Sequence, residues 1–326
     1  MNKIEHSWYK PVSLITLLLL PLSILFWLIS SSRKCLYKLG FLKQFKSKTP
    51  IIVVGNISVG GNGKTPFVLW LFNYLTQQGL SVGIISRGYG GHANNYPLLV
   101  TDQVSTNEAG DEPVLLYHRL KCPIAVGPNR QHSIELLERT YAPDVIISDD
   151  GMQHYKMARS IECCIVDSER KFGNGFLMPA GPLRETTKRL NSVDLVIENG
   201  GQSSSHYTLQ TSPLRRVSGT KPVNSLITSA HAISAIGNPQ RFENSLEAQG
   251  IRLLSTHHFR DHYAYTANDF SGFGDDNVVM TEKDAVKCGS FAKPNWYYLP
   301  VDAQPSDVVI NTLNSLLKEK GILNGL

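Results

Sequence analysis

The stretch that decides the fold runs from Thr49 to Pro66 and reads TPIIVVGNISVGGNGKTP. Residues 51–54 are four consecutive β-branched residues, which predict a buried strand. From Pro66 onward, apolar residues recur at helical spacing, so a helix is expected to follow the loop. A strand, a glycine-rich loop, a Lys-Thr pair and a helix, in this order, are the context of a phosphate-binding loop.

The residue types of this loop suit the capture of phosphate. Its inner glycines let main-chain N–H groups surround a phosphate, and the helix N-terminus adds the positive end of its dipole. Lys64 is expected to bridge β- and γ-phosphates, and the Thr65 hydroxyl to ligate Mg²⁺. The predicted nucleotide-binding residues are Ser58, Val59, Gly60, Gly61, Asn62, Gly63, Lys64 and Thr65. Ser58 replaces a glycine of the general pattern, and a turn that binds nothing is the alternative.

Length and composition narrow the expected number of domains and the class of partner. The chain has 326 residues, enough for two ordinary domains. Its net charge of +5 is too small to indicate nucleic acid, and no nucleic-acid-binding motif is visible, so no such partner is expected. The five cysteines show no C-x-x-C spacing and are predicted to be reduced thiols.

An uncharged apolar run, VSLITLLLLPLSILFWLISS, occupies residues 12–31. As a helix it would be about 30 Å long, which matches the hydrocarbon core of a bilayer. Basic residues are concentrated after it, so we expect the rest of the chain on the cytoplasmic side of the membrane. These residues are Arg33, Lys34, Lys38, Lys43, Lys46 and Lys48. We expect a membrane anchor, either spanning or inserted in one leaflet; a cleaved signal peptide and a buried helix are the alternatives.

After residue 48, strand-like and helix-like segments alternate, which predicts parallel sheets with helices on both faces. We expect a P-loop NTPase-like three-layer α/β/α domain with a second, smaller α/β domain and an N-terminal membrane helix. The expected boundaries are 1–48 for the anchor and basic stem, 49–211 for the P-loop domain, 212–222 for a linker and 223–326 for the second domain. The active site is expected in the cleft between the two domains.

Two acidic segments are candidates for chemistry. Residues 144–150, DVIISDD, resemble a strand that ends in a metal-binding acid. Either Asp149 or Asp150 is the candidate, and the sequence does not choose between them; a turn is the alternative. Asp111 precedes a helix-like run and is either a helix N-cap or a general base.

Basic residues and histidines supply further candidates. Arg184, in the rigid loop PAGPLRE, is expected either to stabilise charge on a transferring phosphoryl group or to form a surface ion pair. Arg87 is either a phosphate contact or part of a surface loop. Lys283 is a candidate phosphate contact; the alternative, which we favour, is that Glu282 and Asp284 cap a helix.

His258 and His262 have the i,i+4 spacing of a zinc pair, but no third ligand has convincing spacing. An acid/base role for His262 in the cleft is the better interpretation.

Taken together, these motifs resemble those of the tetraacyldisaccharide 4′-kinases, over nearly the whole chain. They occur in the family's order, at Gly55–Pro66, Ser86–Gly90, Gly110–Pro113, Asp149–His154, Pro179–Glu185, Ile236–Phe242, Phe259–His262 and Thr281–Ala285.

The resemblance implies an enzyme of lipid A biosynthesis that uses ATP and Mg²⁺. Its acceptor would be the 4′-hydroxyl of an acylated glucosamine disaccharide 1-phosphate embedded in the membrane. It also implies two lobes joined by a short β linker, and an acid at Asp111 that acts as base together with His262. Lys64, Mg²⁺ and Arg184 would neutralise the transferring phosphoryl group. We expect a monomer.

Two rival functions stay open. A membrane-tethered P-loop ATPase acting as a switch usually has a second lysine just before the paired glycines, where this chain has Val59. A kinase or GTPase for another lipid or sugar acceptor is the other rival. The chain lacks the N-K-x-D run that specifies guanine, so ATP is preferred.

Overall fold

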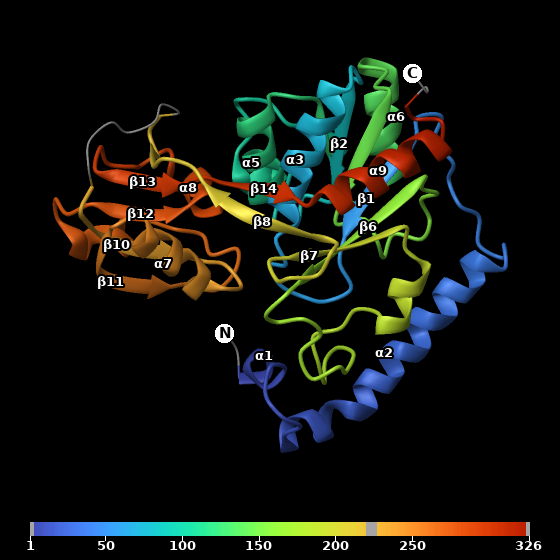
Figure 1. Ribbon diagram of the computed structural model, residues 1–326, viewed down its shortest axis with the longest axis horizontal. Coiled ribbons are helices and arrows are strands. Elements are labelled where there is room, and N and C mark those ends of the chain that lie inside the picture. Colours follow the sequence, from blue (N-terminus) through green and yellow to red (C-terminus); the bar gives the residue numbers. More distant parts are fainter. Residues whose placement is uncertain (1–2, 220–226, 324–326) are drawn as a thin grey trace.

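The computed structural model describes residues 3–219 and 227–323. The last residues of the predicted linker (220–222) and the first and last residues of the predicted second domain (223–226 and 324–326) lie outside this part of the chain. Figure 1 shows two α/β units side by side, and a long N-terminal helix that lies along the larger unit.

The larger unit is built on a nine-stranded sheet with the order β14-β8-β7-β6-β1-β5-β2-β4-β3. Its strands are β1 (Ile51–Gly55), β2 (Val82–Ser86), β3 (Leu98–Leu99), β4 (Ile124–Val126), β5 (Val145–Asp149), β6 (Ile161–Asp167), β7 (Leu195–Asn199), β8 (His206–Thr211) and β14 (Val301–Pro305). All neighbouring strands are parallel except the edge pairs β3–β4 and β14–β8. β1 is central, so the loop that follows it lies at the carboxyl edge where the connections diverge, the usual ligand position in such sheets.

Helices cover both faces of this sheet. They are α3 (Lys64–Gln77), α4 (Thr106–Ala109), α5 (Asp111–Leu120), α6 (Arg130–Thr140), α9 (Asp307–Glu319) and the 3-10 helix η1 (Thr187–Ser192). In β1, Ile52 and Val54 pack in one core with α3, α5 and α9, whereas Ile51 and Val53 pack in another with α6. The strand is therefore buried on both faces, and the predicted three-layer α/β/α class is confirmed.

The smaller unit contains a five-stranded sheet with the order β11-β10-β12-β13-β9. Its strands are β9 (Arg215–Arg216), β10 (Ser229–Ser234), β11 (Arg252–His258), β12 (Val278–Thr281) and β13 (Trp296–Leu299). One face packs on α7 (Pro239–Ala248), and the other on α8 (Glu282–Cys288) and the 3-10 helix η2 (Ala267–Phe273). The two units thus have separate cores.

The end of the chain departs from the expected second domain of 223–326. β14 pairs with β8 and thereby joins the large sheet, and α9 buries Val309, Leu313 and Leu317 in the core of the larger unit. The physical reason is that α9 is amphipathic and its apolar stripe is covered only by the large sheet. The chain therefore runs between the units twice, through the β8–β9 and β13–β14 connections.

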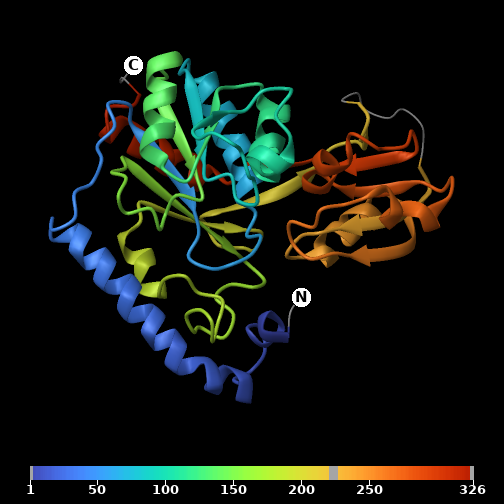
Figure 2. The same ribbon diagram turned by 180° about the vertical axis from the view of Figure 1, so that it is seen from behind.

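The N-terminal region forms α1 (Lys3–Ser7) and α2 (Leu14–Lys38). Among the described residues, α2 is the one helix long and apolar enough to cross a membrane. Its polarity is inverted, because Thr16 and Ser23 are buried against the protein whereas Leu14 and Leu18 are 72% and 70% exposed. Figure 2 shows α2 along the side of the larger unit that faces away from the smaller one.

Candidate active site

The loop between β1 and α3 is fixed by its neighbours. Val59 N donates to Pro182 O (2.8 Å), and Arg184 N donates to Ile57 O (2.7 Å), so the loop that bears Arg184 lies against it. Within the loop, Asn62 Nδ2 donates to Ser58 Oγ (2.8 Å). Ser58 thus has a structural partner at the position where the general pattern has glycine.

Two side chains from β7 and β8 hold the end of the loop. Asn199 Nδ2 donates to Asn62 O (3.1 Å), and Tyr207 Oη donates to Gly63 O (2.6 Å). Gly63 has φ +85°, and a Cβ there would lie 2.2 Å from Asn199 Nδ2. Only glycine fits both the backbone conformation and the space. Sequence reasoning missed Asn199 and Tyr207; the position of Asn199 at the end of a strand was the available signal.

Lys64 lies beside the acids that follow β5. Its Nζ is 3.5 Å from Asp150 Oδ1, and Arg184 Nη1 is 2.9 Å from Asp150 Oδ2. Burial alone would raise the pKa of Asp150, but Lys64 and Arg184 hold it well below its ordinary value. Asp150 is therefore a carboxylate that two cations already neutralise.

Asp149 has the opposite environment. It is 2% exposed, and its Oδ1 is buried without a hydrogen-bond partner in the described structure. Burial raises the pKa of Asp149, and the nearby Glu112 carboxylate adds to the effect. Arg130 Nη2 donates to the main-chain oxygens of Asp149 (2.6 Å) and Asp150 (3.2 Å), which fixes the turn. The orphaned oxygen and the second acid nearby fit a bound cation.

A second polar centre joins the two units. His262 Nδ1 donates to both Asp111 oxygens, at 3.0 and 2.9 Å, although the residues are 151 positions apart. Lys283 Nζ lies 3.2 Å from Glu112 Oε1, 3.1 Å from Asp261 Oδ1 and 3.9 Å from Asp111 Oδ2.

These contacts set the charges of the pair. Burial alone would raise the pKa of Asp111, but the hydrogen bond from His262 and the charge of Lys283 lower it. Burial alone would lower the pKa of His262, but its hydrogen bond to Asp111 raises it. The pairing thus favours the imidazolium form of His262 and the carboxylate form of Asp111.

One cavity of about 1270 Å³ brings both centres together. It is lined by Lys64, Thr65 and Asp150 of the larger unit and by His262 and Lys283 of the smaller one. The expected cleft between units is therefore present; Asp111 and Asp149 are not among its lining residues, and Asp111 reaches it through His262.

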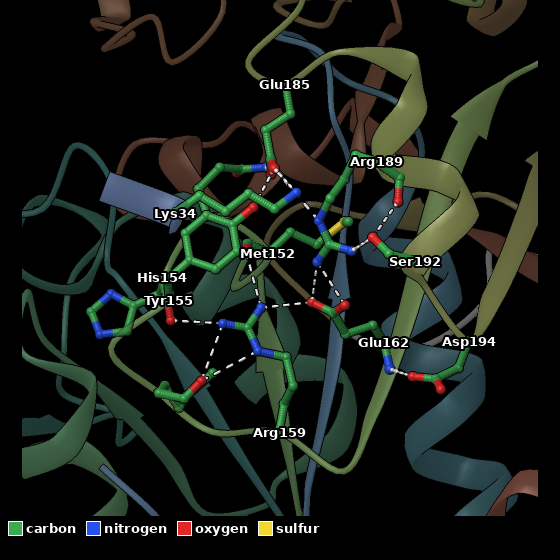
Figure 3. Close-up of polar contacts among 12 residues, drawn as sticks. Lys34, Met152, His154, Tyr155, Arg159, Glu162, Glu185, Arg189, Ser192 and Asp194 are labelled. Atoms are coloured by element: carbon green, nitrogen blue, oxygen red, sulfur yellow. Dashed lines mark hydrogen bonds and ion pairs between the residues drawn. The ribbon is translucent and has the colours of Figure 1, made fainter. Parts of the chain in front are cut away.

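Figure 3 shows how the loop that bears Arg184 is anchored. Glu185 accepts a hydrogen bond from Tyr155 Oη and lies 3.5 Å from both Arg189 Nε and Lys34 Nζ. Arg189 also bonds Glu162 Oε2 at 2.6 Å, and this carboxylate is 9% exposed. The buried charges fix Glu185 and with it the neighbouring Arg184; Lys34 links the end of α2 to the same cluster.

Other predicted residues are placed differently. Arg87 is exposed and does not line the cavity, so the surface-loop interpretation fits it. Asp111 is not the N-cap of α5, because Gly110 occupies that position and the helix begins at Asp111. His258 bonds Glu243 while His262 bonds Asp111, so the two histidines have different partners. Thr281, rather than Glu282 or Asp284, is the N-cap of α8, and Lys283 lies in the cleft.

Comparisons with known proteins agree with this geometry. The family model of tetraacyldisaccharide-1-P 4′-kinase matches residues 15–318. A tetraacyldisaccharide 4′-kinase of Pseudoalteromonas translucida is 76% identical over the full length of both chains. One of Psychromonas ingrahamii is 50% identical over 315 residues, covering 96% of this chain and 98% of the relative.

A solved structure is also similar. The crystal structure of LpxK from Aquifex aeolicus in complex with ATP matches with a TM-score of 0.79 and 29% identity, covering 95% of this chain and all of that one. The chain therefore belongs to the tetraacyldisaccharide-1-P 4′-kinase family.

Proposed function

We propose that this protein transfers the γ-phosphoryl group of ATP to the 4′-hydroxyl of an acylated glucosamine disaccharide 1-phosphate in lipid A biosynthesis. The main observation is that His262, paired with Asp111, and Lys64 of the phosphate loop belong to one cavity between two units. Family membership supplies the reaction, and the ATP-bound relative supports the donor. A monomer stays our prediction.

In the proposed mechanism, the main-chain N–H groups of residues 60–65 bind the triphosphate. Lys64 and Arg184 neutralise charge on the phosphoryl group as it passes in line to the sugar oxygen. Asp111 accepts the proton of the 4′-hydroxyl. His262 and Lys283 keep this carboxylate ionised and oriented before the reaction.

A divalent cation fits the donors at the end of β5. Thr65 with Asp149 and Asp150 would hold Mg²⁺, and the unpartnered Asp149 Oδ1 supports this choice. Bound there, Mg²⁺ would supply positive charge against the β- and γ-phosphate oxygens.

We further propose that α2 lies in one leaflet of the inner membrane rather than across the bilayer. Before the helix, Trp8 Nε1 donates to Pro179 O (2.9 Å); after it, Phe45 N donates to Lys156 O (2.7 Å). Both ends thus contact the larger unit. A spanning helix of this length would instead place its ends on opposite sides of the bilayer, about 38 Å apart. The exposed leucines of α2 face lipid, and the cavity stays at the cytoplasmic surface near a lipid acceptor.

The direct test combines detergent-solubilised protein with γ-labelled ATP, Mg²⁺ and the disaccharide 1-phosphate glycolipid. Label in the lipid supports the kinase, whereas label only in free phosphate supports an ATPase switch. Asp111→Ala is expected to reduce transfer by about 10²–10⁴-fold while nucleotide binding persists. The matched control is Asp102→Ala, which removes an exposed carboxylate paired with Lys121. Near-normal turnover of Asp111→Ala would rule out its role as base.

A further inference from the structure

A second arginine lies at the phosphate loop, outside the set of groups used above. Arg170 follows β6, the strand next to β1, and its main-chain N–H donates to Asp167 Oδ1 (2.9 Å). An added Cβ on Gly60 would lie 2.9 Å from Arg170 Nη2, and one on Gly237 would lie 2.4 Å from Nη1. The guanidinium therefore sits between the phosphate loop and the smaller unit, where both neighbours lack side chains.

The hydrogen-bonding capacity of Arg170 is only partly used. Nη2 donates to the hydroxyl of Tyr9, and the guanidinium carbon lies 4.5 Å from the centre of the Tyr9 ring. Nη1 is buried without a hydrogen-bond partner in the described structure. Nearby Asp167 pairs with Arg241 instead, at 3.3 Å. A buried N–H donor left unpaired is costly, which indicates that a ligand completes this site.

The chemistry of the surroundings selects a phosphoryl group as that ligand. The planar, permanently charged guanidinium suits phosphate oxygens, and Gly60 belongs to the loop expected to bind phosphates. Arg184 is the other arginine beside this loop. Its Nη1 already donates to both carboxylate oxygens of Asp150, at 3.1 and 2.9 Å. Arg170 is thus better placed than Arg184 to give its charge to a ligand.

The residues that hold Arg170 come from the segment before the membrane helix. Trp8 is 9% exposed, and its main-chain oxygen accepts from Asn174 N (2.7 Å), which fixes the segment next to Tyr9. Trp8, Tyr9 and Arg170 all line the main cavity. The N-terminal segment is therefore a wall of the site and not only a leader to the anchor.

We propose that Arg170 binds the γ-phosphoryl group during transfer and that Tyr9 is a positioning residue that aims it. This inference rests on the proposed kinase function. An arginine that contacts the transferring group stabilises charge that develops in the transition state, so it acts mainly on kcat. Tyr9 precedes α2, so the residue that aims Arg170 belongs to the segment that leads into the membrane helix.

The test measures both kinetics and binding of a transition-state analogue. Arg170→Ala is expected to lower kcat about 10²-fold or more with little change in the KM for ATP. It should bind Mg-ADP like the wild type but lose the added affinity for Mg-ADP with aluminium fluoride. Arg170→Lys should recover part of the kcat and part of the added affinity for the aluminium fluoride complex. Free guanidine should partly rescue Arg170→Ala. Arg139→Ala, an exposed arginine on α6, is the control.

Tyr9 is tested through its dependence on Arg170. Tyr9→Ala should lower kcat, and the double variant with Arg170→Ala should be no worse than Arg170→Ala alone, because both act through one group. Additive effects would exclude the positioning role.

Three results separate the possible failures. Unchanged affinity of Arg170→Ala for the aluminium fluoride complex would overturn the proposal. So would a change confined to the KM for the glycolipid, because the ligand would then be the acceptor's phosphate. If Arg170→Ala does not fold, Arg170→Lys decides by the same binding assay once a thermal melt shows that it is folded. Failure of the wild type to bind Mg-ADP or Mg-ATP would instead refute the kinase function.

Discussion

At the scale of single residues, Gly63 shows how one position limits the whole phosphate site. Its backbone has φ +85°, and the side chains of Asn199 in β7 and Tyr207 in β8 lie where a Cβ would be. Gly79 has the same φ of +85° but nothing within 4 Å of an added Cβ. The two glycines therefore separate backbone strain from steric exclusion.

We predict that Gly63→Ala abolishes measurable nucleotide binding, because Asn199 and Tyr207 must move and the loop with them. Gly79→Ala should cost only about 1–2 kcal/mol of unfolding free energy, from the left-handed conformation alone, and keep nucleotide binding. Titration with a fluorescent ADP analogue, together with urea unfolding, measures both effects. Equal binding by the two variants would contradict the importance assigned to the Gly63 contact.

The ion pair of Asp111 and His262 predicts a pH dependence of stability. The pKa of His262 is raised in the folded state, so its contribution is complete below about pH 6.5, the ordinary value, and is lost as the pH rises through the folded pKa. The pKa of Asp111 is lowered, so its contribution is lost only in acid, as the pH falls through the folded pKa.

We therefore expect the unfolding free energy of His262→Gln to be lowest relative to the wild type near pH 6 and to approach the wild type as the pH rises above 6.5. Urea unfolding at several pH values between 6 and 9 gives this difference. His132→Gln, on the exposed side of α6, is the control. A difference that stays constant over this range would show that His262 stabilises only by packing.

At the scale of secondary-structure elements, α2 is the most informative helix. A soluble helix buries its apolar stripe, whereas α2 buries Thr16 and Ser23 and exposes leucines. Ser23 Oγ donates to Leu177 O (2.7 Å), so this buried hydroxyl of α2 has a partner in the larger unit. This inversion is expected of a helix whose outer solvent is lipid.

An accessibility experiment tests the in-plane orientation. In a Cys35→Ser background, Lys10→Cys before α2 and Lys43→Cys after it are both expected to resist a membrane-impermeant maleimide in intact cells and to react in inverted vesicles. The remaining cysteines are buried and serve as the internal background. Labelling of position 10 in cells with a permeable outer membrane and intact inner membrane would show that α2 spans.

At the scale of the whole molecule, the two units are held at the cleft by charged contacts. Arg119 of α5 bonds Glu282 of α8 (2.8 Å) and Asp302 of β14. Burial raises the pKa of Glu282, even though Arg119 opposes the effect. The same helix α8 presents Lys283 to the site, so contacts between the units and catalytic geometry depend on one element.

We predict that Arg119→Ala lowers the unfolding free energy by about 3–5 kcal/mol, because it leaves the Glu282 carboxylate buried without a partner. It should also reduce kcat through Lys283. Lys320→Ala removes the exposed pair with Glu319 and should leave the unfolding free energy close to that of the wild type. Urea unfolding and phosphate transfer measure the two variants, and equal stability would exclude a role for the buried pair.

The sequence alone determined the features that lie within a few neighbouring residues. The strand–loop–helix of residues 51–77, the acids after β5 and the apolar α2 follow from side-chain type and spacing, and the structure has them where they were expected. β8 was not foreseen, because its sequence HYTLQT lacks the continuous apolar run of a buried strand.

Tertiary structure decided whatever depends on contacts between distant segments. The pairing of Asp111 with His262, the support of Gly63 by Tyr207 and the return of α9 to the large sheet each join residues more than 100 positions apart. No local propensity encodes such a meeting, because it follows from which apolar faces cover each other once the sheets have formed.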